Sequence, residues 1–332
     1  MRVLVTGGGG FLGRAIIEQL LARGDAVRSL ARGRYPELEA CGVEVLQGDI
    51  RDAAKVSSAC EGSDLVIHTA AVAGIWGPWE HFYGINVLGT RNVVTGCRAH
   101  RVPKLVYTSS PSVTFDGMPQ ENVNESVGYA SRWLCHYAQT KALGEQEALD
   151  ANSADLAVCA LRPHLIWGPG DQHLIPRLIE QARSGQLRRV GDGSNLIDMV
   201  YVDNAAEAHL QAAETLTPGS PVAGRAYFIS QGEPVNCWQW IDELLGLAGL
   251  PPVERSISLS AAWHVGAAME WAYRLLRLTS EPRMTRFLAG QLGMSHFFDI
   301  TAARRDFGYR PLVSKEAGME RLRVTLRADE SH

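Results

Sequence analysis

A tyrosine and a lysine whose spacing could support acid–base chemistry stand four residues apart, at Tyr137 and Lys141. On a helix this spacing places both side chains on one face. We expect the ammonium to lower the phenol pKa from its reference value of about 10 and also to reach ribose hydroxyls. Tyr137 is therefore a candidate proton donor to a carbonyl oxygen, and a base in the reverse reaction.

Three serines precede this pair at the end of an apolar run, in residues 106–113 (VYTSSPSV). A hydroxyl at the end of a strand could hydrogen-bond the same oxygen that Tyr137 protonates. The residue types alone leave Ser109, Ser110 and Ser112 open as that hydroxyl.

A glycine-rich segment near the start of the chain could bind a dinucleotide. Residues 6–13 (TGGGGFLG) directly follow an apolar run and open an amphipathic pattern. Gly7 permits a tight turn, Gly10 lets the backbone approach a pyrophosphate, and Gly13 allows close helix packing. The free N–H groups of the helix would bind the anion. These features predict cofactor contacts at Gly7, Gly10, Phe11, Leu12 and Gly13.

The next turn indicates which dinucleotide would fit. About 20 residues past the loop, an acid binds the ribose 2′-hydroxyl in many NAD enzymes. Residues 30–34 (LARGR) hold no acid at this place. Arg32, with Arg34 beside it, could instead hold a 2′-phosphate through a bidentate contact, which favours NADP(H). The alternative is a solvated basic turn.

The elements that must position these residues alternate in type. Apolar runs at 2–5, 26–30, 43–47, 65–68 and 105–108 are interleaved with helical patterns at 11–23 and 87–100. This alternation is typical of βαβ units, and unbroken apolar runs are typical of parallel strands covered on both faces. We predict an α/β fold with a doubly wound parallel sheet in residues 1–165. Residues 166–332, interrupted by glycine and proline, are predicted to form mainly a smaller substrate-binding lobe, with segments returning to the sheet.

Composition, charge and residue spacing argue against a nucleic-acid partner, a metal site and a membrane span. The formal net charge of −4 lacks the basic surplus that nucleic-acid binding needs. Six scattered cysteines and ten histidines show no metal-ligand spacing, so no metal site is predicted. No export signal is visible, and the most apolar stretch, 257–278, carries four ionisable residues. We expect a cytoplasmic chain with free thiols and no membrane span, although contact with a membrane surface stays open.

The GxxGxxG loop, the Tyr137–Lys141 pair and the strand-end serines together resemble the extended short-chain dehydrogenase/reductase family. Similar segments cover nearly the whole chain: 86–90, 161–171, 200–204 and 298–311. The resemblance implies a Rossmann fold, Ser110 as the catalytic hydroxyl beside Tyr137 and Lys141, and a homodimer formed through the helices bearing 87–100 and 137–147. It also implies cofactor contacts at Asp49, Ile50, Thr69, Ala70, Ala71, Lys141, Pro163 and His164.

Within that family the chain looks most like the 3β-hydroxysteroid dehydrogenase-like branch. Ile197 stands where nucleotide-sugar enzymes usually carry an arginine, and no Asp-Glu pair accompanies the serines. Residues 165–177, 190–196 and 228–234 resemble bacterial reductases of long-chain olefin biosynthesis. These reduce the 3-keto group of 2-alkyl-3-oxoalkanoic acids with NADPH, in a pathway with a thiolase-like condensing enzyme and a β-lactone synthetase. A sterol or steroid 3-dehydrogenase and a non-catalytic NADP(H)-binding sensor are the alternatives.

Two aromatic segments could form an apolar entrance for long acyl chains. Residues 76–79 (WGPW) follow the apolar run at 65–68, and Trp263, Ala267, Trp271 and Leu275 recur at helical intervals. Such a stripe is more commonly part of a core, so both interpretations stay open. Arg177 or Arg283 could meet a substrate carboxylate, although a lone arginine is more often a surface residue.

Overall fold

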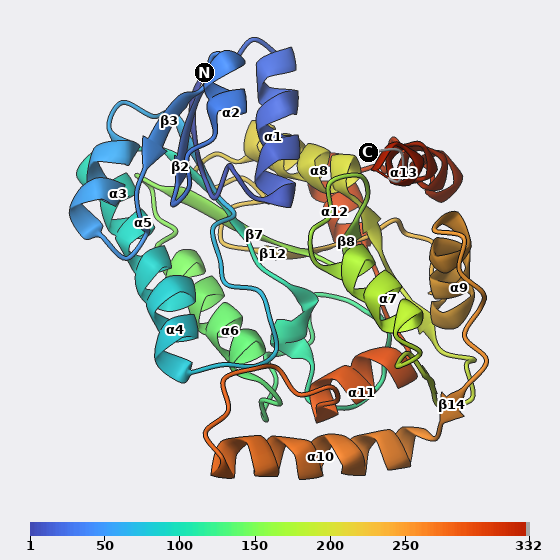
Figure 1. The fold of residues 1–332 in the computed structure, drawn as a ribbon. Helices are drawn as coiled ribbons and strands as arrows, with labels where there is room; N and C mark the ends of the chain where they lie inside the picture. The colour runs from blue at the N-terminus through green and yellow to red at the C-terminus, as the bar shows by residue number, and fades with distance from the viewer. Residues whose placement is uncertain (330–332) are drawn as a thin grey trace.

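A seven-stranded parallel sheet organises the computed structural model, which describes residues 1–329 (Figure 1). Its strand order is β12-β7-β5-β4-β1-β2-β3. The strands are β1 (Arg2–Thr6), β2 (Ala26–Ala31), β3 (Glu44–Gln47), β4 (Leu65–His68), β5 (Lys104–Thr108), β7 (Ala157–Pro163) and β12 (Ala226–Ile229). The order reverses between β1 and β4, which opens a crevice at their carboxyl ends. The predicted doubly wound α/β fold is confirmed.

The side chains of β1 alternate between two separate cores. Val3 and Val5 belong to the core that includes α1 (Phe11–Ala22) and α8 (Val202–Thr215). Leu4 belongs to the core on the other face, with α3 (Ala53–Cys60) and α5 (Gly89–Ala99). Because successive side chains point to opposite faces, a strand covered on both sides must be apolar throughout.

The helical segment predicted at 87–100 begins earlier than expected. It starts as α4 (Trp79–Tyr83), passes through the π-helical turn η1 (Gly84–Leu88) and continues as α5. The Asn86 side chain in η1 bonds both backbone groups of Val72 and the Thr140 hydroxyl. The wider turn thus links the loop after β4 to α6 (His136–Leu149), the helix that carries Tyr137.

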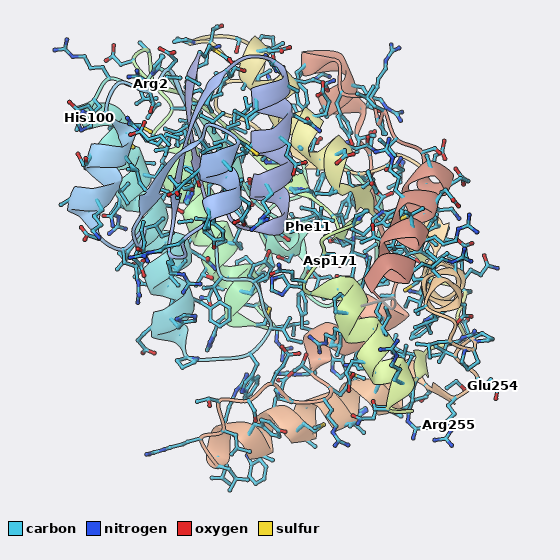
Figure 2. All side chains as sticks on the ribbon, turned by 45° about the horizontal axis from the view of Figure 1, so that its top comes forward. Arg2, Phe11, His100, Asp171, Glu254 and Arg255 are labelled. Atoms are coloured by element: carbon cyan, nitrogen blue, oxygen red, sulfur yellow. The ribbon has the colours of Figure 1, made fainter. Side chains whose placement is uncertain are left out.

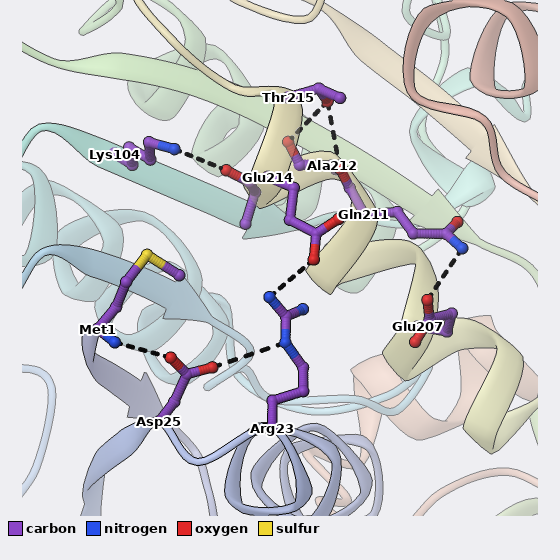
Figure 3. Close-up of polar contacts among 10 residues, drawn as sticks. Met1, Arg23, Asp25, Lys104, Glu207, Gln211, Ala212, Glu214 and Thr215 are labelled. Atoms are coloured by element: carbon purple, nitrogen blue, oxygen red, sulfur yellow. Dashed lines mark hydrogen bonds and ion pairs between the residues drawn. The ribbon is translucent and has the colours of Figure 1, made fainter.

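Segments beyond residue 165 also cover the sheet. Helix α8 is joined to the end of α1 by an ion pair of 2.7 Å between Arg23 and Glu214. The Lys104 ammonium at the start of β5 donates to the Ala213 carbonyl, 3.0 Å away (Figure 3). Helix α12 (Thr301–Phe307) packs against α8, and the short α2 (Pro36–Ala40) precedes β3.

The smaller lobe is built from short strands and peripheral helices. Its main sheet has the order β13-β10-β15-β6, and β8 pairs with β11 while β9 pairs with β14. One of these strands, β6 (Gln120–Val123), comes from the first half of the chain. The others are β8 (Ile166–Trp167), β9 (Arg189–Val190), β10 (Leu196–Ile197), β11 (Val200–Tyr201), β13 (Val235–Asn236), β14 (Ser256–Ile257) and β15 (His296–Phe298). The helices are α7 (Leu174–Arg183), α9 (Cys237–Leu247), α10 (Leu259–Leu275), α11 (Arg286–Gly293) and α13 (Lys315–Asp329).

The expectations about the cysteines and about a membrane span can be compared with this fold. All six cysteines are free thiols, and every one except Cys41 is buried. Within residues 1–329, no helix combines the length and the apolar character needed to cross a bilayer.

Candidate functional site

A cavity of about 330 Å³ lies at the carboxyl edge of the sheet, around the crevice between β1 and β4. Every predicted cofactor residue lines it except Lys141, Pro163 and His164. The predicted residues that line it are Gly7, Gly10, Phe11, Leu12, Gly13, Arg32, Asp49, Ile50, Thr69, Ala70 and Ala71. The structure thus brings together four segments that are separate in the sequence.

The glycine loop needs its glycines for steric reasons. Gly7 has φ +76°, and a Cβ there would lie 2.8 Å from the Ala70 backbone. A Cβ on Gly13 would lie 2.3 Å from the Gly7 carbonyl oxygen. The Gly10 N–H donates to that same oxygen over 2.9 Å and closes the turn. Larger residues at positions 7 and 13 would displace the backbone that borders the cavity.

Several residues that line the cavity were not predicted, among them Tyr35, Gln172 and His173. Tyr35 packs over Gly9, where a Cβ would lie 1.9 Å from the ring. The extra glycine at position 9, outside the GxxGxxG spacing, was the available signal. Gln172 and His173 belong to the smaller lobe, so no local pattern could have connected them with the loop.

The smaller lobe reaches this cavity at the start of α7. Figure 2 shows Phe11 and Asp171 close together, where the sheet meets the smaller lobe. A Cβ at the neighbouring Gly170 would lie 3.9 Å from the Phe11 ring. The Asp171 carboxylate accepts the backbone N–H groups of His173 and Ile175, each over 2.8 Å. This contact fixes the turn that brings His173 to the cavity.

Arg32 is exposed at the cavity edge. Among the described residues no ion pair engages its guanidinium, whereas Arg34 is directed toward the Gln47 side chain at 3.5 Å. Hydrogen bonds from Arg51 lower the pKa of Asp49, and the charge of Arg32 lowers it further. The Arg32 charge therefore remains directed at the cavity.

Tyr137 and Ser110 meet at the end of β5. Tyr137 lies in the first turn of α6, and Ser110 precedes the 3₁₀ turn η2 (Pro111–Thr114). Burial raises the pKa of Tyr137, while a hydrogen bond with Ser110 lowers it. The hydroxyls of Ser109 and Ser112 are buried and have no hydrogen-bond partner within the described chain. Of the three serines, Ser110 is thus the one that influences the phenol pKa, and its catalytic role stays a prediction.

Lys141 occupies the predicted helix face but not the predicted electrostatic role. Its ammonium donates to the Thr108 carbonyl at 2.5 Å and lies 4.3 Å from the centre of the Tyr107 ring. Burial lowers the pKa of Lys141 to about 7, against the opposing charge of Glu145. The prediction that Lys141 lowers the Tyr137 pKa is wrong, because burial dominates at the phenol and the ammonium is held by the end of β5.

A buried ion pair continues the same face of α6. The Glu145 carboxylate accepts two hydrogen bonds from Arg162, at 3.0 and 2.6 Å, and one from the Tyr129 hydroxyl at 2.8 Å. Glu145 was not predicted, although it follows Tyr137 and Lys141 at the same interval of four. Its charge is therefore compensated inside the protein, which a buried carboxylate requires.

His164 and Pro163 lie at the end of β7, away from the described cavity lining. The His164 ring makes a 2.6 Å hydrogen bond to His296 and packs edge-on against Phe298. Burial lowers the pKa of His164. Its ring thus serves the packing of the smaller lobe, and a cofactor contact through it stays a prediction.

The aromatic stripe of α10 divides into two parts. Trp263 and Ala267 are half-buried, whereas Trp271 and Leu275 are exposed. The Trp76 indole N–H donates to the Leu278 carbonyl at 3.1 Å, which joins the two predicted aromatic segments. Between them lies a second cavity of about 210 Å³.

Arg177, a candidate partner for a substrate carboxylate, forms an ion pair with Glu281 at 2.5 Å, so its charge is already engaged.

Comparisons with known proteins agree with this geometry. The 3-beta hydroxysteroid dehydrogenase/isomerase family matches residues 4–259. A 2-alkyl-3-oxoalkanoate reductase of Stenotrophomonas maltophilia is 50% identical over 98% of this chain and 99% of its own length. The decarboxylating sterol-4-alpha-carboxylate 3-dehydrogenase of Mus musculus is 32% identical over 96% and 88%. The structure of Thermus thermophilus UDP-glucose 4-epimerase in complex with NAD has a TM-score of 0.75 and 26% identity, over 98% of this chain and 99% of that one.

Proposed function

Because the chain belongs to the 3-beta hydroxysteroid dehydrogenase/isomerase family, we propose that it reduces the 3-keto group of long-chain 2-alkyl-3-oxoalkanoic acids with NADPH. The product is the 2-alkyl-3-hydroxyalkanoic acid. The observation that carries this proposal is the placement of Tyr137 and Ser110 at the end of β5, on the same carboxyl edge of the sheet as the glycine-loop cavity. The substrate class is supported by 50% identity to a reductase of that name.

The residues of the first cavity fit a nicotinamide dinucleotide. The glycines at positions 7 and 13 leave a cradle that a Cβ would fill, and the start of α1 offers backbone N–H groups to a pyrophosphate. When bound, the cofactor supplies the hydride at its nicotinamide ring. A similar structure holds NAD, which supports this class of cofactor.

The finer choice of NADP(H) over NAD rests on Arg32. Its exposed guanidinium at the cavity edge could pair with a ribose 2′-phosphate, and charge-assisted bidentate contacts of this kind are strong. The alternative, a solvated basic turn, predicts equal binding of the two cofactors.

The chemical step uses the residues at the end of β5 and the start of α6. Tyr137 donates its hydroxyl proton to the ketone oxygen as the carbonyl carbon is reduced, and Ser110 hydrogen-bonds the same oxygen. Lys141 positions the ribose of the cofactor from within the same helix face. In the oxidative direction the phenolate of Tyr137 accepts the proton.

The proposal places the reaction in olefin biosynthesis, between a thiolase-like condensing enzyme and a β-lactone synthetase that uses the hydroxy acid. We propose a cytoplasmic homodimer with α5 and α6 at its interface. The Rossmann unit of residues 1–165 holds the cofactor, and residues 166–332 supply most of the substrate site.

A sterol or steroid 3-dehydrogenase is the second candidate. It is favoured by the 32% identity to a sterol dehydrogenase over nearly the whole chain. The proposed catalytic residues are compatible with both substrates, so the shape of the substrate site decides between them. A non-catalytic NADP(H) sensor is a third alternative, and it has no use for a proton donor beside the cofactor.

The direct test is cofactor reduction by the purified chain, run in the oxidative direction because β-ketoacids decarboxylate. NADP⁺ or NAD⁺ is supplied with a 2-alkyl-3-hydroxy fatty acid or a 3β-hydroxysteroid. Turnover of the branched acid with NADP⁺, and none of the steroid, is the expected result. Turnover of the steroid and not of the branched acid would favour the sterol or steroid 3-dehydrogenase function. Cofactor binding without turnover of either substrate would favour the sensor.

A further inference from the structure

The end of α10 exposes a group of large apolar side chains. They are Trp271, Leu275, Leu276 and Leu278, with exposed fractions between 42% and 68%. We call these four residues, together with Arg274 and Arg277, the α10 patch. Figure 1 shows α10 at the outer edge of the molecule, beyond α11 and far from the parallel sheet. Contiguous exposed apolar surface of this kind marks an interaction site.

The patch is held outward by a narrow contact on the opposite side of the helix. Along α10 only Ala262, Gly266 and Glu270 are buried. A Cβ on Gly266 would lie 2.6 Å from the Thr285 backbone, so α10 approaches the start of α11 very closely. The Glu270 carboxylate accepts the Arg286 backbone N–H at 2.7 Å. These contacts fix the rotation of α10 and leave its apolar end in solvent.

The charges within the patch are all positive. Residues 271–279 contain Arg274 and Arg277 and no acid. The nearest acids in sequence are Glu281, which pairs with Arg177, and Glu270, which is buried against Arg286 at 2.6 Å and lies 3.8 Å from Arg274. Arg277 is therefore the patch arginine whose charge no ion pair offsets among the described residues. A tryptophan and leucines flanked by arginines are typical of helices that lie in the interface of a bilayer. The positive charge favours a surface of anionic lipid.

The second cavity opens along the edge of the patch and extends to the start of α6. Tyr273 and Leu278 line it on the patch side, and Trp76 lines it from the loop after β4. Cys135, two residues before Tyr137, lines its other end. Tyr137 itself packs in the small hydrophobic cluster that contains Cys135 and Leu134. The groove therefore connects the patch with the end of α6 that holds the proposed proton donor.

We propose that the α10 patch docks the protein onto an anionic lipid bilayer, and that this groove receives acyl chains directly from that bilayer. Two long acyl chains make the proposed substrate partition into lipid, so a docked enzyme would meet it where it is concentrated. The delivery of substrate rests on the proposed function. The docking itself does not, because it depends only on the patch.

The test measures binding of the full chain to vesicles, without cofactor or substrate. Vesicles of phosphatidylcholine alone are compared with vesicles that also contain phosphatidylglycerol, by co-sedimentation at low and high salt. We expect binding to the anionic vesicles that weakens as salt rises, and much weaker binding to the neutral ones.

The apolar contribution is tested with paired leucine substitutions. The variant Leu275→Ser/Leu276→Ser should lower the partition coefficient by about tenfold or more. The matched control, Leu312→Ser/Val324→Ser, removes two comparably exposed side chains, 72% and 62% exposed, at another place. It should leave partitioning unchanged. Thermal unfolding and cofactor affinity of each variant verify that it is folded.

The charge contribution has its own matched pair. Arg277→Gln should weaken binding to the anionic vesicles by about fivefold, the contribution of one basic residue near such a surface. Arg101 is also exposed and shares a left-handed φ of 53°, so Arg101→Gln controls for both charge and backbone conformation.

Several outcomes would overturn the docking proposal. One is absence of binding to anionic vesicles, and another is binding that the Leu275/Leu276 variant does not reduce. Equal affinity for neutral and anionic vesicles would contradict the proposed preference for anionic lipid. Dissociation of a dimer by the leucine variant, without vesicle binding, would make the patch an interface between copies of this chain. Vesicle binding does not depend on the reductase assay. A negative reductase assay would therefore contradict the proposed function and leave the docking proposal standing.

Discussion

The cofactor cavity and the groove beside α10 are built in different ways. The cofactor cavity depends on backbone shape, because Gly7 and Gly13 leave room that side chains would fill. The groove beside α10 depends on side chains from three distant segments, 75–78, 134–136 and 273–279. The glycine loop, a part of a site made by local backbone geometry, can be identified from one short motif. A site made by distant side chains becomes visible only after folding.

Loss of the Tyr137 hydroxyl should have the largest effect, because this hydroxyl is the proposed proton donor. Tyr137→Phe removes the proton donor, and we expect turnover to fall by about 10²–10⁴-fold. Cofactor affinity should stay nearly unchanged, since the phenol ring remains. Steady-state kinetics together with a fluorescence titration of NADPH measure both quantities. A variant that kept its full rate would contradict the mechanism.

Gly13→Ala should damage the cofactor cavity and leave the groove intact. Its methyl group would lie 2.3 Å from the Gly7 carbonyl oxygen, so the loop must shift. We expect cofactor affinity to fall by roughly 100-fold, on the scale of backbone strain of about 1–3 kcal/mol. Gly246→Ala in α9 is the control, because a Cβ there would have nothing within 4 Å and the residue does not line the cavity. Equal losses in both variants would show that the close contact at Gly13 is not the cause.

Arg32→Ala separates the recognition of the 2′-phosphate from the rest of the cavity. We expect NADPH affinity to fall by about 10–100-fold, the loss of a charge-assisted contact, with NADH affinity unchanged. Arg34→Ala, whose side chain faces Gln47, should have a smaller effect. Parallel losses for NADPH and NADH after Arg32→Ala would leave the cofactor preference unexplained.

Lys141 should make stability depend on pH. Burial lowers its pKa to about 7 from the ordinary value of 10.5, so the unfolded chain binds more protons between these values. Its contribution to the free energy of unfolding therefore rises as the pH increases from about 7 toward 10.5. Lys141→Met should remove this dependence and stabilise the chain at pH 6 by roughly 1–4 kcal/mol, while impairing turnover. Denaturant unfolding at several pH values measures the difference, and an unchanged pH dependence would contradict the assignment.

Trp76→Phe should have the smallest effect and should be confined to the groove. An aromatic ring is kept at this position, although a smaller one, and the hydrogen bond of the indole N–H to the Leu278 carbonyl is lost. We expect a rise of a few-fold in KM for a long-chain substrate, with kcat and cofactor affinity unchanged, since such a bond contributes about 1 kcal/mol. A shorter-chain substrate serves as the control. A change in cofactor affinity would mean that the two cavities are coupled.

The reliable predictions came from requirements that are local in the chain. Parallel strands buried on both faces must be apolar, and this condition revealed β1 and β4 directly. The π-helical turn at 84–88 was missed, because it depends on Asn86 bonding a loop and another helix. Tyr35 was missed for a similar reason, since only packing brings it over Gly9.

By itself the sequence determined the parallel sheet, the glycine loop and the placement of Tyr137 and Lys141 on one helix face. Only the tertiary structure decided how burial changes the pKa values of Tyr137 and Lys141, and that Ser110 lowers the pKa of Tyr137. It also decided that Trp271 and Leu275 of α10 face solvent while Trp263 is half-buried. The reason is physical: spacing along a helix or strand is set by the backbone, whereas burial, charge balance and exposure are set by segments far away in the chain.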